Sequence, residues 1–149
     1  MSATKMQAYR NVQKATIVSE REIDAYALTQ CAQKLRECQQ NWDMSENERI
    51  DRLFAALRIN GKLWSIFQAE ITRDGNPLPK QVREDLLTLS LFVDKRTKDI
   101  MCFPEAEKLT VLININLNLA AGLSAARAQD KPDKPESGGR PQGVGDTSV

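Results

Sequence analysis

The chain is 149 residues long and has 21 basic and 20 acidic side chains, which leave a formal charge of +1. A charge so close to zero gives no indication of a nucleic-acid or membrane surface. The sequence contains no histidine, which excludes Ser-His-Asp and Cys-His nucleophilic sites, histidine-ligated metals and an imidazole pH switch. Hydrophobic residues make up 41% of the chain and aromatic residues only 5%, so we expect one domain with a mostly aliphatic core.

The composition changes at Gln129. The segment from there to the end holds four of the seven glycines and three of the six prolines, and its only apolar side chains are two valines. Such a segment cannot bury enough apolar surface to offset the entropy lost on ordering. We therefore predict a folded domain over residues 3–128 and a disordered tail over residues 129–149.

The folded part carries two helix-start motifs and few helix-breaking residues. Ser19 with Glu22, and Ser45 with Glu48, each match the capping box, in which side chains satisfy the free backbone donors of the first turn. We also expect a short helix through Met6 before the first motif. Apolar residues at helical spacing follow both motifs: Ile23, Ala27, Cys31, Leu35 and Cys38 after the first, and Ile50, Leu53, Leu57, Trp64, Phe67 and Ile71 after the second.

The second of these stripes contains Asn60-Gly61, which is ordinarily a turn signal. The heptad register is kept across the pair, and this predicts one long helix with a weak point there, a true break being the alternative. The sequence Asp74-Gly75-Asn76-Pro77 predicts a turn, after which Pro79 suits the first turn of a further helix.

That helix ends at Pro104, and we expect a last helix from about Glu105. Residues 113–119 of the last helix alternate between apolar and polar, which is the period of a strand. A lone strand would have no partner elsewhere in this chain, so we predict helix here as well. The short N-terminal helix through Met6 also includes Tyr9 and Val12. Together these elements predict an all-α fold, a single compact bundle of about five helices.

No residue constellation indicates an enzyme. The carboxylates lie beside Lys or Arg at helical spacing, as Glu48 does with Arg52, which is typical of solvated pairs. There is no phosphate-binding glycine loop, EF-hand or nucleophile elbow. We therefore expect no catalytic residues, no metal and no cofactor. Three cysteines without CxxC spacing, which are Cys31, Cys38 and Cys102, are interpreted as small buried side chains.

The sequence predicts a cytoplasmic protein without membrane insertion. The first 16 residues lack the apolar core of a signal peptide, and no stretch reaches the ~18 uninterrupted apolar residues of a membrane span. Direct RNA binding is disfavoured, because acidic residues interleave with the basic ones and no aromatic stacking platform accompanies them.

Apolar surface is the remaining candidate for a site. The run from Leu63 to Phe67 places large side chains around more than half of the helix circumference, which suits a groove for an amphipathic helix. Trp64 lies in the core register with Phe67, whereas Leu63 and Ile66 flank that register and are the better candidates for exposure. The complete set of candidate partner-binding residues is Leu63, Trp64, Ile66, Phe67, Phe92, Ile115 and Leu119.

Five segments jointly resemble the flagellar biosynthesis regulator FlaF family, in its order and spacing over about residues 6–124. They are AYRNVQKAT, SEREIDAYALTQCAQKL, RINGKLWSIFQAEI, NPLPKQVREDLLTLSLFVDKRTKDI and LTVLININLNLAAGL. The sequence departs from the family pattern at Phe92 and at Arg96-Thr97, where many relatives carry Trp and a His-Thr pair. The resemblance implies an all-helical cytoplasmic protein that supports flagellin synthesis and secretion.

The resemblance also implies partners. Unassembled flagellin exposes amphipathic terminal segments, and chaperone-like binding of flagellin would shield them until export. A regulator resembling FlbT is the expected companion. The alternative is a post-transcriptional regulator of flagellin expression that acts on the mRNA directly or through FlbT. In addition, the apolar surplus of the last helix makes a homodimer reasonable.

Overall fold

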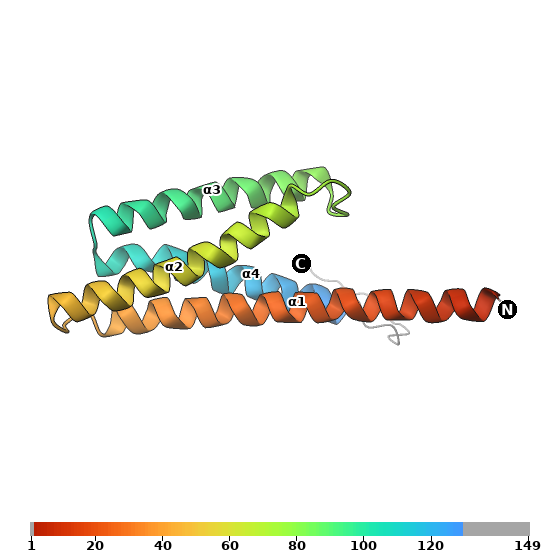
Figure 1. Cartoon of the computed structure of the whole chain (residues 1–149), viewed down its shortest axis with the longest axis horizontal. Helices are drawn as coiled ribbons and strands as arrows, with labels where there is room; N and C mark the ends of the chain where they lie inside the picture. The colour runs from red at the N-terminus through yellow and green to blue at the C-terminus, as the bar shows by residue number, and fades with distance from the viewer. Residues whose placement is uncertain (1, 130–149) are drawn as a thin grey trace, which may run out of the picture.

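The computed structural model describes residues 2–129, and its regular elements there are all helical. Helix α1 spans Ser2–Gln40, α2 Glu46–Ile71, α3 Lys80–Cys102 and α4 Leu109–Gln129, and a short 3₁₀ helix, η1, spans Ala106–Lys108. Each α-helix runs antiparallel to the next, and the N-terminal end of α1 extends past the other helices (Figure 1). The all-α class is confirmed, but the described residues form four α-helices rather than about five.

The N-terminal region accounts for the difference. The short helix predicted through Met6, Tyr9 and Val12 and the helix predicted to begin at Ser19 are both parts of α1. No glycine or proline lies between Ser2 and Gln40, so nothing in the sequence forces the backbone out of the helical conformation. In a continuous helix, the backbone N–H groups that a capping box would satisfy already donate to the carbonyls of the preceding turn.

Helix α2 begins and continues as predicted. The Ser45 hydroxyl oxygen accepts from the Glu48 backbone N–H over 3.4 Å, and the same hydroxyl donates to the Glu48 carboxylate over 3.0 Å. The helix passes through Asn60-Gly61 without a break. This confirms the interpretation of one long helix.

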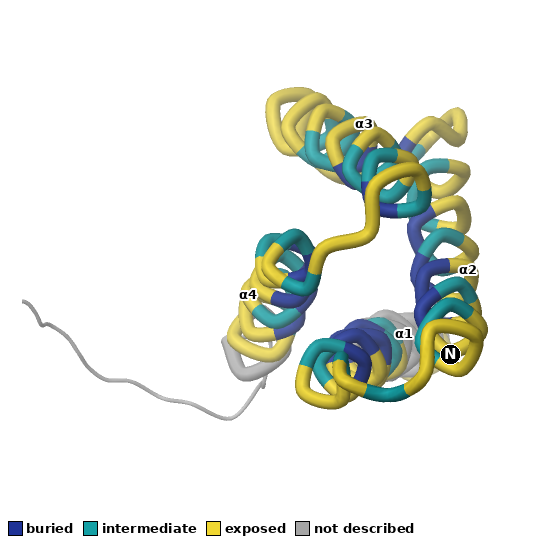
Figure 2. Tube along the Cα trace, turned by 90° about the vertical axis from the view of Figure 1, so that its left-hand side faces the viewer, coloured by how far each residue is buried: buried dark blue, intermediate teal, exposed yellow. Residues whose placement is uncertain are grey.

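The core lies where α1, α2 and α4 face one another, and α1 packs most extensively against α4. Figure 2 shows the buried positions of each helix turned toward the centre of the bundle. Helix α3 contributes only a few buried residues, and its Leu91 is exposed. Ile23 of α1, the first residue of the stripe predicted after Ser19, is also exposed. The largest fully buried apolar side chains are Leu28, Leu35, Leu53, Leu57, Trp64, Val93, Ile100, Leu109 and Leu112.

Two asparagines are buried within this apolar core. The Asn116 Nδ2 group of α4 donates to the Asn60 Oδ1 atom of α2 over 2.7 Å, and the Trp64 indole N–H donates to Asn116 Oδ1 over 3.0 Å. All three side chains have no exposed surface. Asn116 is the central asparagine of the alternating segment, and its neighbours Asn114 and Asn118 are exposed. The segment is therefore helical, as predicted, and its one buried asparagine ties α4 to α2.

The turn between α2 and α3 forms where it was predicted. Gly75 has a φ of 81°, a conformation that costs other residues about 1–2 kcal/mol. The Asn76 side chain donates to the Glu70 carbonyl over 2.8 Å and accepts from the Leu78 backbone N–H over 2.9 Å. Pro79 is the N-cap residue of α3.

The last helix is preceded by the 3₁₀ helix η1 instead of beginning near Glu105. The Gln39 amide of α1 donates to the Ala106 carbonyl and to the Thr110 hydroxyl, over 2.9 and 2.8 Å, and so ties the end of α1 to the start of α4. The predicted tail starts at Gln129, the last residue of α4, and residues 130–149 lie outside the described part of the chain.

The two central glycines of the chain should respond oppositely to alanine. In Gly61→Ala the added Cβ meets no described atom within 4 Å, and alanine loses less backbone entropy in a helix, so the free energy of unfolding should rise by about 0.5–1 kcal/mol. In Gly75→Ala the free energy of unfolding should fall by about 1–2 kcal/mol, because alanine is strained at the positive φ of this position. Urea unfolding followed by circular dichroism measures both, and a destabilised Gly61→Ala variant would contradict this account.

Removing the central member of the buried polar network should be costly. In Asn116→Ala the Trp64 indole N–H and the Asn60 side-chain oxygen lose their partners inside the core. The free energy of unfolding should therefore fall by about 2–4 kcal/mol. The exposed Asn114 on the same helix provides the matched control, and Asn114→Ala should change the free energy by about 0.5 kcal/mol or less. Equal effects of the two substitutions in urea unfolding would show that the network does not stabilise the fold.

Candidate partner-binding cleft

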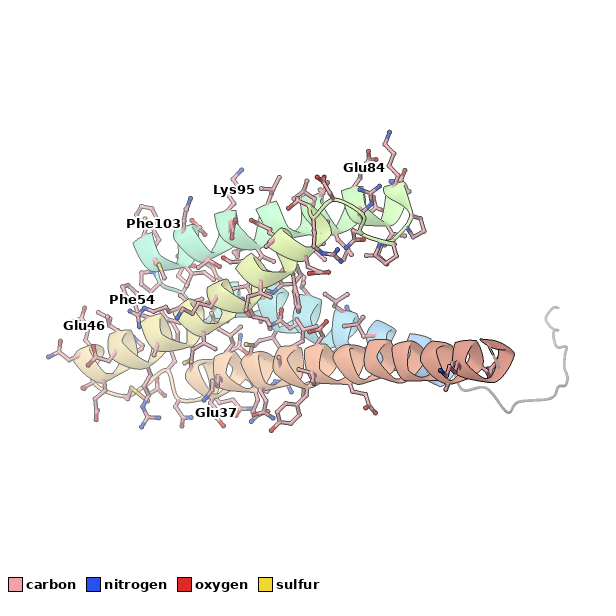
Figure 3. The ribbon with its side chains drawn as sticks, turned by 45° about the vertical axis from the view of Figure 1, so that its right-hand side comes forward. Glu37, Glu46, Phe54, Glu84, Lys95 and Phe103 are labelled. Atoms are coloured by element: carbon pink, nitrogen blue, oxygen red, sulfur yellow. The ribbon has the colours of Figure 1, made fainter. Side chains whose placement is uncertain are left out.

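Helices α2 and α3 diverge from α1 toward the turn that joins them (Figures 1 and 3). An apolar cleft lies beside that turn. Its volume is about 130 Å³, and all four helices contribute to it. We call it the apolar cleft. Its lining residues are Asp24 of α1, Trp64, Phe67, Glu70 and Ile71 of α2, Asn76 and Leu78 of the turn, Leu86 of α3, and Leu119 and Leu123 of α4.

Trp64 forms the buried floor of the apolar cleft and has no exposed surface of its own. Its ring meets the Phe67 ring edge-on, with 5.5 Å between the centroids and 82° between the planes, an arrangement that aromatic pairs favour. Because the indole N–H is bonded to Asn116, the buried polar network sets the position of this floor. Phe67 and Leu119 are half-buried and leave part of their apolar surface facing the cleft.

The polar side chains at the apolar cleft include two carboxylates, Asp24 and Glu70. The Arg73 guanidinium donates to the exposed Glu70 carboxylate over 2.6 Å, and this hydrogen bond and the Arg73 charge lower the pKa of Glu70. Glu70 is therefore ionised at neutral pH. The cleft combines an apolar interior with an acidic group at its edge.

Three of the seven predicted partner-binding residues line the cleft: Trp64, Phe67 and Leu119. Leu63 and Ile115 are half-buried and pack against the core outside it. Ile66 is 64% exposed, but it lies about 200° around α2 from Trp64 and so on another side of the helix. Phe92 is exposed on α3, with the Arg96 guanidinium 5.7 Å from its ring centroid.

Four apolar lining residues were not among the predicted site residues: Ile71, Leu78, Leu86 and Leu123. Ile71 belongs to the stripe predicted after Ser45, and Leu86 and Leu123 lie within helices. A helical stripe does not show where a neighbouring helix fails to cover it. Leu78 had a clearer signal. It lies between two prolines, which exclude it from a helix interior, and it is a large apolar residue in a turn.

Other features of the surface do not extend this site. The charged side chains of Glu84 and Lys95 point away from the bundle on the outer side of α3 (Figure 3). Within residues 2–129 there is no group of His, Cys, Asp and Glu side chains that could hold a metal ion. None of the helices described there has both the length and the apolar character that spanning a membrane requires.

The cysteines differ in environment. Cys31 and Cys38 are buried in α1, as predicted, and burial raises the pKa of each thiol from its ordinary value of 9.0. The prediction is wrong for Cys102, which is exposed. Cys102 is the last residue of α3, and the chain turns away from the core there toward Pro104.

The fold and the cleft define a class, an all-helical protein with an apolar cleft between its helices. The family model described as "Flagellar protein FlaF" matches residues 5–123. The match covers most of the chain, which therefore belongs to the FlaF family. Comparison with curated proteins and with solved structures gave no match.

The three thiols should separate in reactivity. A thiol reagent such as Ellman's should modify Cys102 rapidly in the native protein and should reach Cys31 and Cys38 only on unfolding, because the buried thiols are inaccessible and resist ionisation. Cys102→Ser should therefore remove the fast phase. Three equal rates in the native protein would contradict the burial of α1.

The buried thiols of Cys31 and Cys38 should make the free energy of unfolding depend on pH in alkaline solution. Their folded-state pKa values lie above 9.0, so the folded state holds these protons more tightly than the unfolded state. The two protonated thiols make their full contribution to the free energy of unfolding below pH 9, and this contribution is lost as the pH rises through the folded-state pKa values. Urea unfolding at increasing pH measures the loss, and replacing both thiols by alanine should remove this part of the pH dependence.

Proposed function

We propose that this FlaF-family chain supports flagellin synthesis and secretion as a chaperone-like protein that binds flagellin in the apolar cleft. The observation that carries the proposal is the convergence of Phe67, Leu119 and the other half-buried apolar side chains at one opening of the bundle. A preformed apolar cleft of this kind suits the apolar face of an amphipathic helix. In this proposal, the amphipathic terminal segments of unassembled flagellin supply that helix in the cytoplasm before export.

The size of the cleft supports a peptide rather than a small molecule as its occupant. Small-molecule sites usually measure about 300–1,000 Å³, whereas this cleft has about 130 Å³. It therefore has room for roughly one or two anchoring side chains, which is how helices bind to grooves. The rest of the bound helix would lie along the rim formed by α2 and α4.

The charges at the cleft also favour a bound protein segment over direct contact with flagellin mRNA. Among the described residues that line the cleft, the charged ones are Asp24 and Glu70 and none is Lys or Arg, so the lining offers no cation to the phosphates on which nucleic-acid affinity depends. Regulation of flagellin expression through an FlbT-like protein is compatible with the cleft, because that partner would also be a protein.

Two aspartate substitutions of exposed apolar residues test the location of the site. Leu78 lies at the cleft and outside the helices, and is 37% exposed. Leu78→Asp should weaken flagellin binding about tenfold, the effect of losing one buried leucine contact. Ile66→Asp makes a similar change on another side of α2 and should leave the affinity within about twofold. Fluorescence anisotropy with labelled flagellin measures both, and circular dichroism checks that each variant keeps its helicity.

The outcomes separate the alternatives. Loss of binding in Ile66→Asp with none in Leu78→Asp would move the contact to the outer side of α2 and reject the cleft. Docking by apolar contact should change little with salt, whereas direct RNA binding would weaken steeply as salt rises. A salt-sensitive mobility shift of flagellin mRNA by this chain alone, without flagellin binding, would replace the chaperone proposal with the regulatory one.

A further inference from the structure

A second concave surface lies between α1 and α2, which run side by side near the C-terminal end of α1 (Figure 1). The groove between them has a volume of about 260 Å³. It shares no described lining residue with the apolar cleft. We call it the outer groove, and its lining residues are Lys34, Glu37 and Cys38 of α1 and Arg52, Ala55, Ala56 and Ile59 of α2.

An apolar stripe of α2 leads out of the outer groove into solvent. Ile59 is 44% exposed and Ile66 is 64% exposed, and the half-buried Leu63 lies between them. The spacings of four and three residues place all three side chains on one side of the helix. We call them the outer stripe. Helices present their anchoring residues to one another at this spacing, so the outer stripe has the form of a helix-binding surface.

The charges beside the outer stripe are predominantly positive. Residues 52–69 of α2 contain three basic residues and no acidic one. Lys62 follows Ile59 by three residues and precedes Ile66 by four, so it lies next to both. Arg52 and Lys34 line the outer groove at the end of the stripe. Within residues 2–129, none of these three cations forms an ion pair.

The acidic side chain that lines the outer groove is Glu37, and its carboxylate accepts a hydrogen bond of 3.4 Å from the Gln33 amide. The two cations of the groove, Lys34 and Arg52, outnumber this single carboxylate, and Lys62 extends the positive charge along the outer stripe. A helix whose apolar side covers the stripe is therefore favoured when it carries carboxylates beside that side.

The same features disfavour other occupants. A second copy of this surface would set Arg52 and Lys62 against the same cations. A flat bilayer does not reach the buried Ala56 and Cys38 inside the groove, and basic residues contribute only about 1 kcal/mol each at an anionic membrane. For a nucleic acid, the described residues of the groove and stripe provide no aromatic ring on which a base could stack.

We propose that the outer groove and the outer stripe bind an acidic amphipathic helix of another protein. Its apolar side chains contact Ile59, Leu63 and Ile66, and its carboxylates pair with Arg52 and Lys62. Because this surface and the apolar cleft have different lining residues, the contact does not depend on the flagellin proposal.

The first test uses a labelled synthetic helix of about five turns, with leucines along one side and glutamates beside them. Fluorescence anisotropy with the full chain should show binding, and Ile66→Asp should weaken it about tenfold. Two matched controls should stay within about twofold: Leu91→Asp, at an exposed position of α3, and Leu78→Asp, at the apolar cleft. Circular dichroism checks the helicity of each variant. No binding, or an unaffected Ile66→Asp variant, overturns the proposal, and a loss confined to Leu78→Asp places the peptide in the cleft instead.

The second test exchanges the charges, so that an effect on folding cannot imitate the result. A peptide with lysines in place of the glutamates should bind the wild type at least about tenfold more weakly than the acidic peptide. The double variant Arg52→Glu, Lys62→Glu should reverse this preference and gain affinity for the lysine peptide. An unchanged preference rejects the role of the two cations.

The remaining occupants have their own measurements. Wild-type chain and Ile66→Asp are compared by flotation with phosphatidylglycerol vesicles and by sedimentation equilibrium without any partner. Neither vesicle binding nor self-association should depend on Ile66. Vesicle binding that Ile66→Asp abolishes would assign the outer stripe to a membrane, and self-association that it abolishes would assign the stripe to a second copy; either result overturns the proposal.

Discussion

The structure depends on the hydrogen bonds that join Trp64, Asn116 and Asn60 inside an otherwise aliphatic core. Apolar contacts are not directional, and a core built from Leu, Ile, Ala and Cys tolerates small shifts of one helix along another. A hydrogen bond of 2.7 Å between Asn116 and Asn60 does not tolerate them, because a displaced partner would leave a buried polar group unpaired. The network therefore fixes both the height and the rotation of α4 against α2.

The apolar cleft follows from this constraint. Since Trp64 is held from within by Asn116, its ring stays at the base of the opening while α2 diverges from α1. Helix α3 covers only part of the space between the diverging helices, and it contributes few buried residues. One of its contacts with α2 is the hydrogen bond that the Gln68 amide donates to the Asp94 carboxylate, 3.0 Å long. The uncovered remainder of the α2 and α4 stripes forms the cleft walls.

Periodicity and turn chemistry were sufficient to predict α2, the turn at Gly75 and the helical state of the alternating segment around Asn116. They were not sufficient at Ser19, because a capping motif describes how a helix can start and not whether the preceding residues are already helical. The residues that line the apolar cleft were predicted only in part. The α2 stripe identified Trp64 and Phe67, but the crossing angles of the helices decide that Leu78 and Leu123 join them and that Ile66 does not, and those angles arise from packing over the whole bundle.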